Sequence, residues 1–179
     1  AAALRPYEGV TARLLYARGI TDAAQADAFL NPSLDRLHDP LRMHGMAEAL
    51  DILTDARRKG LAAAVYGDYD VDGICACALM TQALRRFGLR ADPHTPLREE
   101  GYGLNLAAVE QLAKDHRVLV TVDLGITNHE EVRLAQRLGM RVIVTDHHGL
   151  GLEASPADAA LNPLLGDYPF RRLCGTGVA

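Results

Sequence analysis

The chain has 179 residues, a formal net charge of −4, 49% hydrophobic residues and 23% charged residues. These proportions are ordinary for a folded globular protein, and the length suits one core with a small addition. The acidic balance argues against a protein that binds nucleic acid by net charge alone, although bound cations would offset acidic side chains.

Two features bear on where the protein works. No apolar run is long enough to cross a membrane, and the first residues do not have the pattern of a signal peptide. The three cysteines, Cys75, Cys77 and Cys174, are an odd number without the spacing of a metal site. We therefore expect a reducing compartment and predict a cytoplasmic protein without membrane association.

The first part of the chain, residues 1–45, has a helical pattern. Two short helices are expected, in residues 7–20 and 21–32, and Pro32 stops the second of them. We expect this helical segment to pack on a core that is formed by residues 46–179.

From residue 46 onward, the pattern is one of alternating strands and helices. Three nearly continuous apolar runs are typical of strands that are buried on both faces. These runs are residues 61–67, 117–123 and 141–146. Weaker strand patterns cover residues 89–96 and 157–163, and helical patterns cover residues 46–60, 73–88, 105–115 and 128–139. The alternation predicts an α/β fold with a mostly parallel, twisted sheet that is flanked by helices.

Acidic and imidazole side chains follow the three stronger strands. They are Asp68, Asp70 and Asp72 after the first, Asp123 after the second, and Asp146, His147 and His148 after the third. A single aspartate after a strand can equally be the N-cap of the next helix, and for Asp123 alone the two interpretations have equal weight. The carboxyl ends of parallel strands form one edge, where ligands bind. Several like charges at that edge need a cation between them, which favours a metal site.

The composition of this edge indicates the metal. Carboxylates with one or two imidazoles suit Mn²⁺, with Mg²⁺, Co²⁺ or Zn²⁺ as lesser options. The carboxylates exceed the need of one ion, so we expect two ions roughly 3.5–4 Å apart, with Asp123 as the bridging ligand. Adjacent residues of an extended segment point in opposite directions. One of His147 and His148 is therefore expected to be a ligand, and the other to face the substrate or a supporting acid.

The motifs around these residues resemble those of the DHH phosphoesterases. The first three motifs of that superfamily are similar to GDYDVDG (residues 67–73), VTVDLGITNHEE (residues 120–131) and VIVTDHHGLG (residues 142–151). Three further segments narrow the resemblance to the RecJ family of single-strand-specific 5′→3′ DNA exonucleases. These segments are RGITDAAQADAFLNPSLDRLHDPLRM (residues 18–43), EEGYGLN (residues 99–105) and CGTGVA (residues 174–179). The resemblance covers nearly the whole chain.

The resemblance implies a role for each candidate residue. The expected metal ligands are Asp68, Asp70, Asp72, Asp123 and His147. Asp68 stands near the position where related phosphoesterases place a ligating histidine. His148 is expected to contact the scissile phosphate, and Asp146 to orient its neighbours. The expected catalytic residues are thus His148, Asp146 and Asp123, and the expected substrate-binding residues are His148 and Arg98.

The resemblance also implies an activity. We expect a 5′→3′ exonuclease that uses two Mn²⁺ or Mg²⁺ ions to hydrolyse single-stranded DNA in repair and recombination. A single-strand-binding protein and a helicase are the expected protein partners. The alternatives are another DHH phosphoesterase (an oligoribonuclease, a cyclic-dinucleotide phosphodiesterase or a pyrophosphatase) or a non-catalytic nucleic-acid-binding module of DHH type.

One ligand of the family is expected outside this sequence. The family supplies a further ligating aspartate in a fourth motif, downstream of the segment that resembles GVA at residues 177–179. We therefore expect residues 46–179 to be an incomplete DHH domain that lacks this motif and the C-terminal domains. Residues 1–179 alone are expected to be weakly active or inactive.

Overall fold

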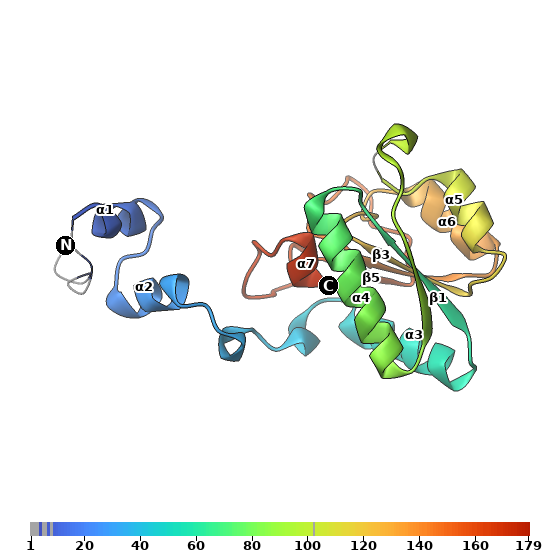
Figure 1. Cartoon of the computed structure of the whole chain (residues 1–179), viewed down its shortest axis with the longest axis horizontal. Coiled ribbons are helices and arrows are strands. Elements are labelled where there is room, and N and C mark those ends of the chain that lie inside the picture. Colours follow the sequence, from blue (N-terminus) through green and yellow to red (C-terminus); the bar gives the residue numbers. More distant parts are fainter. Residues whose placement is uncertain (1–3, 5–6, 8, 102) are drawn as a thin grey trace. The chain divides into compact units, whose positions relative to one another are not determined.

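The computed structural model describes residues 4, 7, 9–101 and 103–179 (Figure 1). The chain divides into two compact units, Ala1–His38 and Asp39–Ala179. The candidate site lies wholly within the second unit. The packing of the helical prelude on the core stays a prediction.

The first unit is helical where it is described. It contains α1 (Gly9–Ala17), α2 (Ala23–Leu30) and the 3₁₀ helix η2 (Leu34–Arg36). The side chain of Asp22 caps α2 by accepting a hydrogen bond from the N–H of Gln25 at 2.8 Å. Both α-helices fall within the segments that the sequence predicts to be helical.

The second unit contains a sheet of five parallel strands in the order β2-β1-β3-β4-β5. The strands are β1 (Ala62–Gly67), β2 (Arg90–His94), β3 (Val118–Val122), β4 (Arg141–Thr145) and β5 (Ala159–Leu161). The predicted fold class is confirmed, and both weak strand candidates are strands. Pro93 is tolerated in β2 because an edge strand pairs on one side only.

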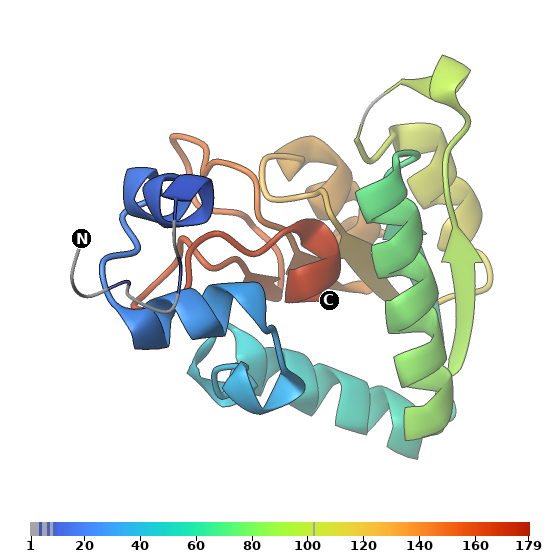
Figure 2. The ribbon, with the colours of Figure 1, turned by 60° about the vertical axis from the view of Figure 1, so that its left-hand side comes forward.

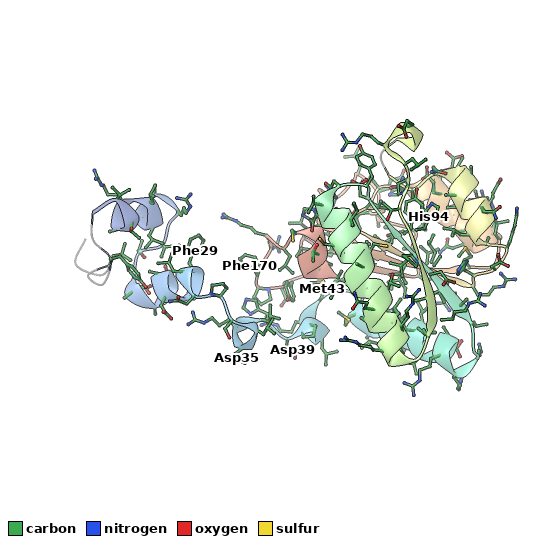
Figure 3. All side chains as sticks on the ribbon, viewed as in Figure 1. Phe29, Asp35, Asp39, Met43, His94 and Phe170 are labelled. Carbon is green, nitrogen blue, oxygen red and sulfur yellow. The ribbon has the colours of Figure 1, made fainter. Side chains whose placement is uncertain are left out.

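Helices cover both faces of this sheet (Figures 1 and 2). The helices of the unit are η3 (Pro40–Arg42), α3 (Met46–Arg58), α4 (Val71–Phe87), η4 (Arg98–Glu100), α5 (Leu106–Leu112), α6 (His129–Arg137) and α7 (Gly175–Val178). Side chains alternate along each strand, so Ala63 and Val65 of β1 join the core under α3 and α4, together with Met43 (Figure 3). Ala64 and Tyr66 join the core under α5 and α6.

The strand order reverses direction at β1. From β1 the chain moves to β2 on one side and then to β3 on the other side. In open α/β sheets, ligands bind at such a reversal, outside the carboxyl ends of the strands. Among the described helices, none is long and apolar enough to cross a membrane.

Candidate metal centre

The loops after β1, β3 and β4 bring most of the predicted metal ligands together. Two groups have ligand atoms that all lie within 4.8 Å of one another: Asp68, Asp70 and Asp123, and Asp123, His147 and His148. Asp123 belongs to both groups. A carboxylate at the junction of two ligand groups is what a bridging position between two ions requires.

The backbone places Asp123 at this junction in an unusual conformation. Asp123 directly follows β3, and among the described residues it is the only one other than glycine with a positive φ, 63°. Its N–H donates to the carbonyl of Thr145 at 2.9 Å. Asn128, rather than Asp123, is the N-cap residue of α6. The N-cap interpretation of Asp123 is therefore wrong, and its role as a metal ligand stays a prediction.

The side chain of Asp123 is buried without full compensation for its charge. Its exposed fraction is 2%, and Oδ1 accepts no hydrogen bond from the described residues, although Nε2 of His147 lies 3.1 Å away. Burial, and then the charges of Asp72 and Asp70, raise the pKa of Asp123 to about 7. A bound cation would supply the missing partner, so the residues present fit a metal ion.

Asp146 organises the histidine pair. Its Oδ1 accepts hydrogen bonds from the N–H of His147 at 2.7 Å, the N–H of His148 at 3.1 Å and Nδ1 of His148 at 2.7 Å. Its Oδ2 accepts from the N–H of Ile126 at 3.0 Å. Four donors leave this carboxylate little capacity for a metal, which agrees with the orienting role that the resemblance implies.

The two histidines differ in their partners. Nε2 of His147 faces Asp123, whereas Nδ1 of His148 contacts Asp146. Their ring centroids are 4.5 Å apart, so both rings stay close to the centre. Burial would lower the pKa of His148, but the hydrogen bond and charge of Asp146, together with Asp123 and Asp68, raise it.

The loop after β1 supplies two further carboxylates of the centre. Asp68 is buried and accepts from the N–H of Tyr69 at 2.7 Å; burial raises its pKa. Asp70 is exposed and caps α4 by accepting from the N–H of Gly73 at 2.9 Å. The N-cap role thus applies to Asp70, and it does not remove Asp70 from the ligand group.

Asp72 lies beside both groups rather than within them. Its Oδ2 is 3.9 Å from Nε2 of His147. Gly175 and Thr176, at the start of α7, donate hydrogen bonds to its carboxylate. Burial would raise the pKa of Asp72, but these hydrogen bonds outweigh it and lower the pKa to about 2. The sequence did not indicate that Gly175 and Thr176 contact Asp72, because the segment CGTGVA contributed only to the family resemblance.

Arg98 lies in η4 and is not part of either ligand group. Its guanidinium carbon is 5.1 Å from the ring centroid of Tyr69, the residue between two of the acidic ligands. Tyr69 is not among the site residues predicted from the sequence, although an aromatic residue within an acidic motif is a usable signal. His94, which Figure 3 labels, lies at the end of β2. Its ring stacks on that of Tyr66, with ring centroids 4.9 Å apart.

The fold and these strand-end residues agree with the family comparison. The model of the DHH family, N-terminal domain, matches residues 62–179. The chain belongs to this family.

Within that class, the chain is similar to RecJ proteins. It is 36% identical over 174 residues to the single-stranded-DNA-specific exonuclease RecJ of Bacillus subtilis (strain 168), which is 95% of this chain and 22% of that protein. It is 39% identical over 172 residues to the RecJ of Escherichia coli (strain K12), which is 93% of this chain and 29% of that protein. The chain thus spans less than a third of these curated relatives.

Two solved structures of RecJ resemble this chain. The crystal structure of RecJ in complex with Mn²⁺ from Thermus thermophilus matches with a TM-score of 0.73 and 32% identity, over 99% of this chain and 24% of that one. The same protein in complex with Mg²⁺ matches with a TM-score of 0.56 and 27% identity, over 99% of this chain and 20% of that one. The predicted resemblance to the DHH phosphoesterases, and to RecJ within them, is confirmed.

Proposed function

We propose that the protein is a divalent-metal-dependent 5′→3′ exonuclease that hydrolyses phosphodiester bonds of single-stranded DNA, in repair and recombination. The observation that carries the proposal is the buried carboxylate of Asp123, which two groups of ligand atoms share. The similarity to RecJ exonucleases supports the choice of substrate.

The metal would be Mn²⁺ or Mg²⁺, held by Asp68, Asp70, Asp72, Asp123 and His147, of which Asp72 adjoins the two ligand groups. When bound, such ions supply Lewis acidity and lower the pKa of a water towards neutrality. The raised pKa of Asp123 means that metal binding near neutral pH displaces a proton from this carboxyl group. Two ions would use the overlap of the two ligand groups at Asp123.

His148 is the proposed contact to the scissile phosphate. Asp146 holds Nδ1, which fixes the ring and places Nε2 on the opposite side. The raised pKa of His148 favours the imidazolium form, whose Nε2–H can donate to a phosphate oxygen as negative charge develops there. The side chain is 45% exposed, so a substrate can reach it. Arg98, above Tyr69, is the proposed contact to further phosphates of the strand.

The alternatives predict other substrates. An oligoribonuclease, a cyclic-dinucleotide phosphodiesterase or a pyrophosphatase would use the same centre on short substrates, and a binding module would not need the intact acids. No observation on this chain favours one of these over the RecJ-like activity.

A chimera tests the proposal, because the chain spans only part of its relatives. This chain replaces the aligned segment of the Escherichia coli RecJ, and the product is assayed on 5′-phosphorylated single-stranded DNA, duplex DNA, short RNA, a cyclic dinucleotide and pyrophosphate with Mn²⁺. We expect degradation of long single strands from the 5′ end, and loss of activity with Asp123→Asn. A folded chimera that binds Mn²⁺ but degrades another of these substrates instead would contradict the proposal.

Location and protein partners are finer points of the same proposal. We propose that the protein works in the cytoplasm, with a single-strand-binding protein and a helicase as partners. Free cysteines at positions 75, 77 and 174 support a reducing compartment. Affinity purification of the tagged protein from its own cells, with and without nuclease treatment, tests the partners.

A further inference from the structure

The segment CGTGVA, at residues 174–179, is built into the metal centre. Helix α7, which begins at Gly175, lies beside α4 in both ribbon views (Figures 1 and 2). Asp72, in the first turn of α4, meets it there. The proposed function assigns no role to this segment.

The start of α7 determines which oxygen of Asp72 faces the centre. Oδ1 accepts from the N–H of Thr176 at 2.8 Å and from its hydroxyl at 2.6 Å. Oδ2 accepts from the N–H of Gly175 at 2.7 Å. A carboxylate oxygen accepts about two hydrogen bonds, so Oδ1 is used fully. Oδ2 accepts one N–H bond and is the oxygen 3.9 Å from Nε2 of His147, and the side chain of Cys174 adds a further hydrogen bond to this carboxylate.

The Thr176 hydroxyl also ties the backbone to this arrangement. It lies 3.0 Å from the carbonyl oxygen of Asp72 as well as 2.6 Å from its carboxylate. The side chain and the main chain of Asp72 are thus held by one residue 104 positions away in the sequence. A carboxylate held in this way cannot rotate without breaking several hydrogen bonds.

Gly175 contacts the other side of the centre. A Cβ at position 175 would overlap Oδ1 of Asp123 and would lie 2.5 Å from its Cβ and Cγ atoms. The same short turn therefore packs against the carboxylate shared by the two ligand groups while it holds Asp72. Only a residue without a side chain allows this approach.

We propose that Gly175 and Thr176 are positioning residues of the metal centre: the Thr176 hydroxyl fixes Asp72 with Oδ2 towards His147, and Gly175 lets the turn close against Asp123. The inference rests on the proposed function, since it assigns these residues to the centre that holds the metal. Partners that orient a ligand typically contribute about 10–100-fold to metal affinity. We expect Thr176→Val to lower Mn²⁺ affinity by about tenfold. Thr176→Ser should keep the wild-type affinity, because serine keeps the hydroxyl.

The test titrates the chain with Mn²⁺ and measures free Mn²⁺ by electron paramagnetic resonance. The comparison covers wild type, Thr176→Val, Thr176→Ser and Gly175→Ala. Thr81→Val is the control, because it removes a buried threonine hydroxyl from a different helix, α4. Urea unfolding with a chelator shows whether each variant is folded. Thr176→Ala takes the place of the valine variant if that one does not fold.

The outcomes distinguish failure of the inference from failure of the proposed function. A weaker Mn²⁺ affinity in folded Thr176→Val, restored by serine and unchanged by Thr81→Val, supports the inference. Equal affinity of wild type and Thr176→Val, or equal losses for valine and serine, would overturn it while the proposed function stands. A folded chimera that binds no Mn²⁺ would overturn the proposed function, and the inference with it.

Discussion

Asp123→Asn should change how the stability of the metal-free protein depends on pH. Asparagine keeps the shape of the side chain and tolerates the positive φ of this position, so the substitution removes the charge with little backbone strain. Alanine would add strain to the loss of charge. The comparison therefore reports on the buried carboxylate itself.

The magnitude follows from the pKa of Asp123. The folded protein keeps a proton on this group up to pH about 7, whereas the unfolded chain releases it near 3.8. Because the unfolded state binds fewer protons over this range, the free energy of unfolding falls as pH rises from about 4 to 7. At 1.36 kcal/mol per unit, the whole effect is about 4 kcal/mol, of which about 2 to 3 kcal/mol falls between pH 5 and pH 8.

Urea unfolding at pH 5 and pH 8 with a chelator measures this effect. The raised pKa of His148 acts in the same direction, since its stabilising contribution is lost as pH rises through that pKa. The difference between wild type and Asp123→Asn reports Asp123 together with the part of the His148 shift that the charge of Asp123 causes. At pH 8, Mn²⁺ should raise the free energy of unfolding of the wild type, whereas it should not raise that of the variant. Identical pH dependence of the two metal-free proteins would refute the account of Asp123 as a buried, uncompensated carboxylate.

Two further predictions concern other residues of the candidate metal centre. His147→Ala should weaken Mn²⁺ binding, whereas His148→Ala should keep it and lower kcat in the chimera; calorimetry and the nuclease assay separate the two, and equal losses of affinity would contradict the division of roles. Gly73→Ala should lower the thermal midpoint, because a Cβ there would lie 2.6 Å from backbone and side-chain atoms of Asp68. Gly149→Ala is its matched control, since an added Cβ meets no atom within 4 Å there, and equal midpoints would show that the close approach at Gly73 is unimportant.

Much of the fold was predictable because its signals are local. The apolar runs of β1, β3 and β4 are nearly continuous, as expected for strands buried between two layers of helices. Even β2 and β5, with weaker patterns, were placed correctly. The topology then brings the strand ends to one edge, so the candidate ligands can be grouped from the sequence alone.

The remaining features depend on contacts between distant segments. From the sequence, N-cap and metal ligand were alternative roles for an aspartate that follows a strand. In the structure, Asp70 caps α4 and also belongs to a ligand group. Thr176 and Asp72 are 104 positions apart, and no periodicity connects them. The positive φ of Asp123 has no sequence signal, because aspartate is common in ordinary turns.

The distance along the chain between Asp72 and α7 has a consequence for biogenesis. Chains emerge from the ribosome with the N-terminal part first, so β1, β3 and β4 can assemble before residues 174–179 are made. Closing a loop of this length is entropically slow relative to local pairing, and the donors to Asp72 should therefore arrive last. Nascent chains that end before Gly175 should show the secondary structure of the sheet but little affinity for Mn²⁺, which circular dichroism and metal titration of a chain ending at Leu173 can measure. Such a delay would keep the candidate metal centre unassembled until nearly all of these residues have been synthesised.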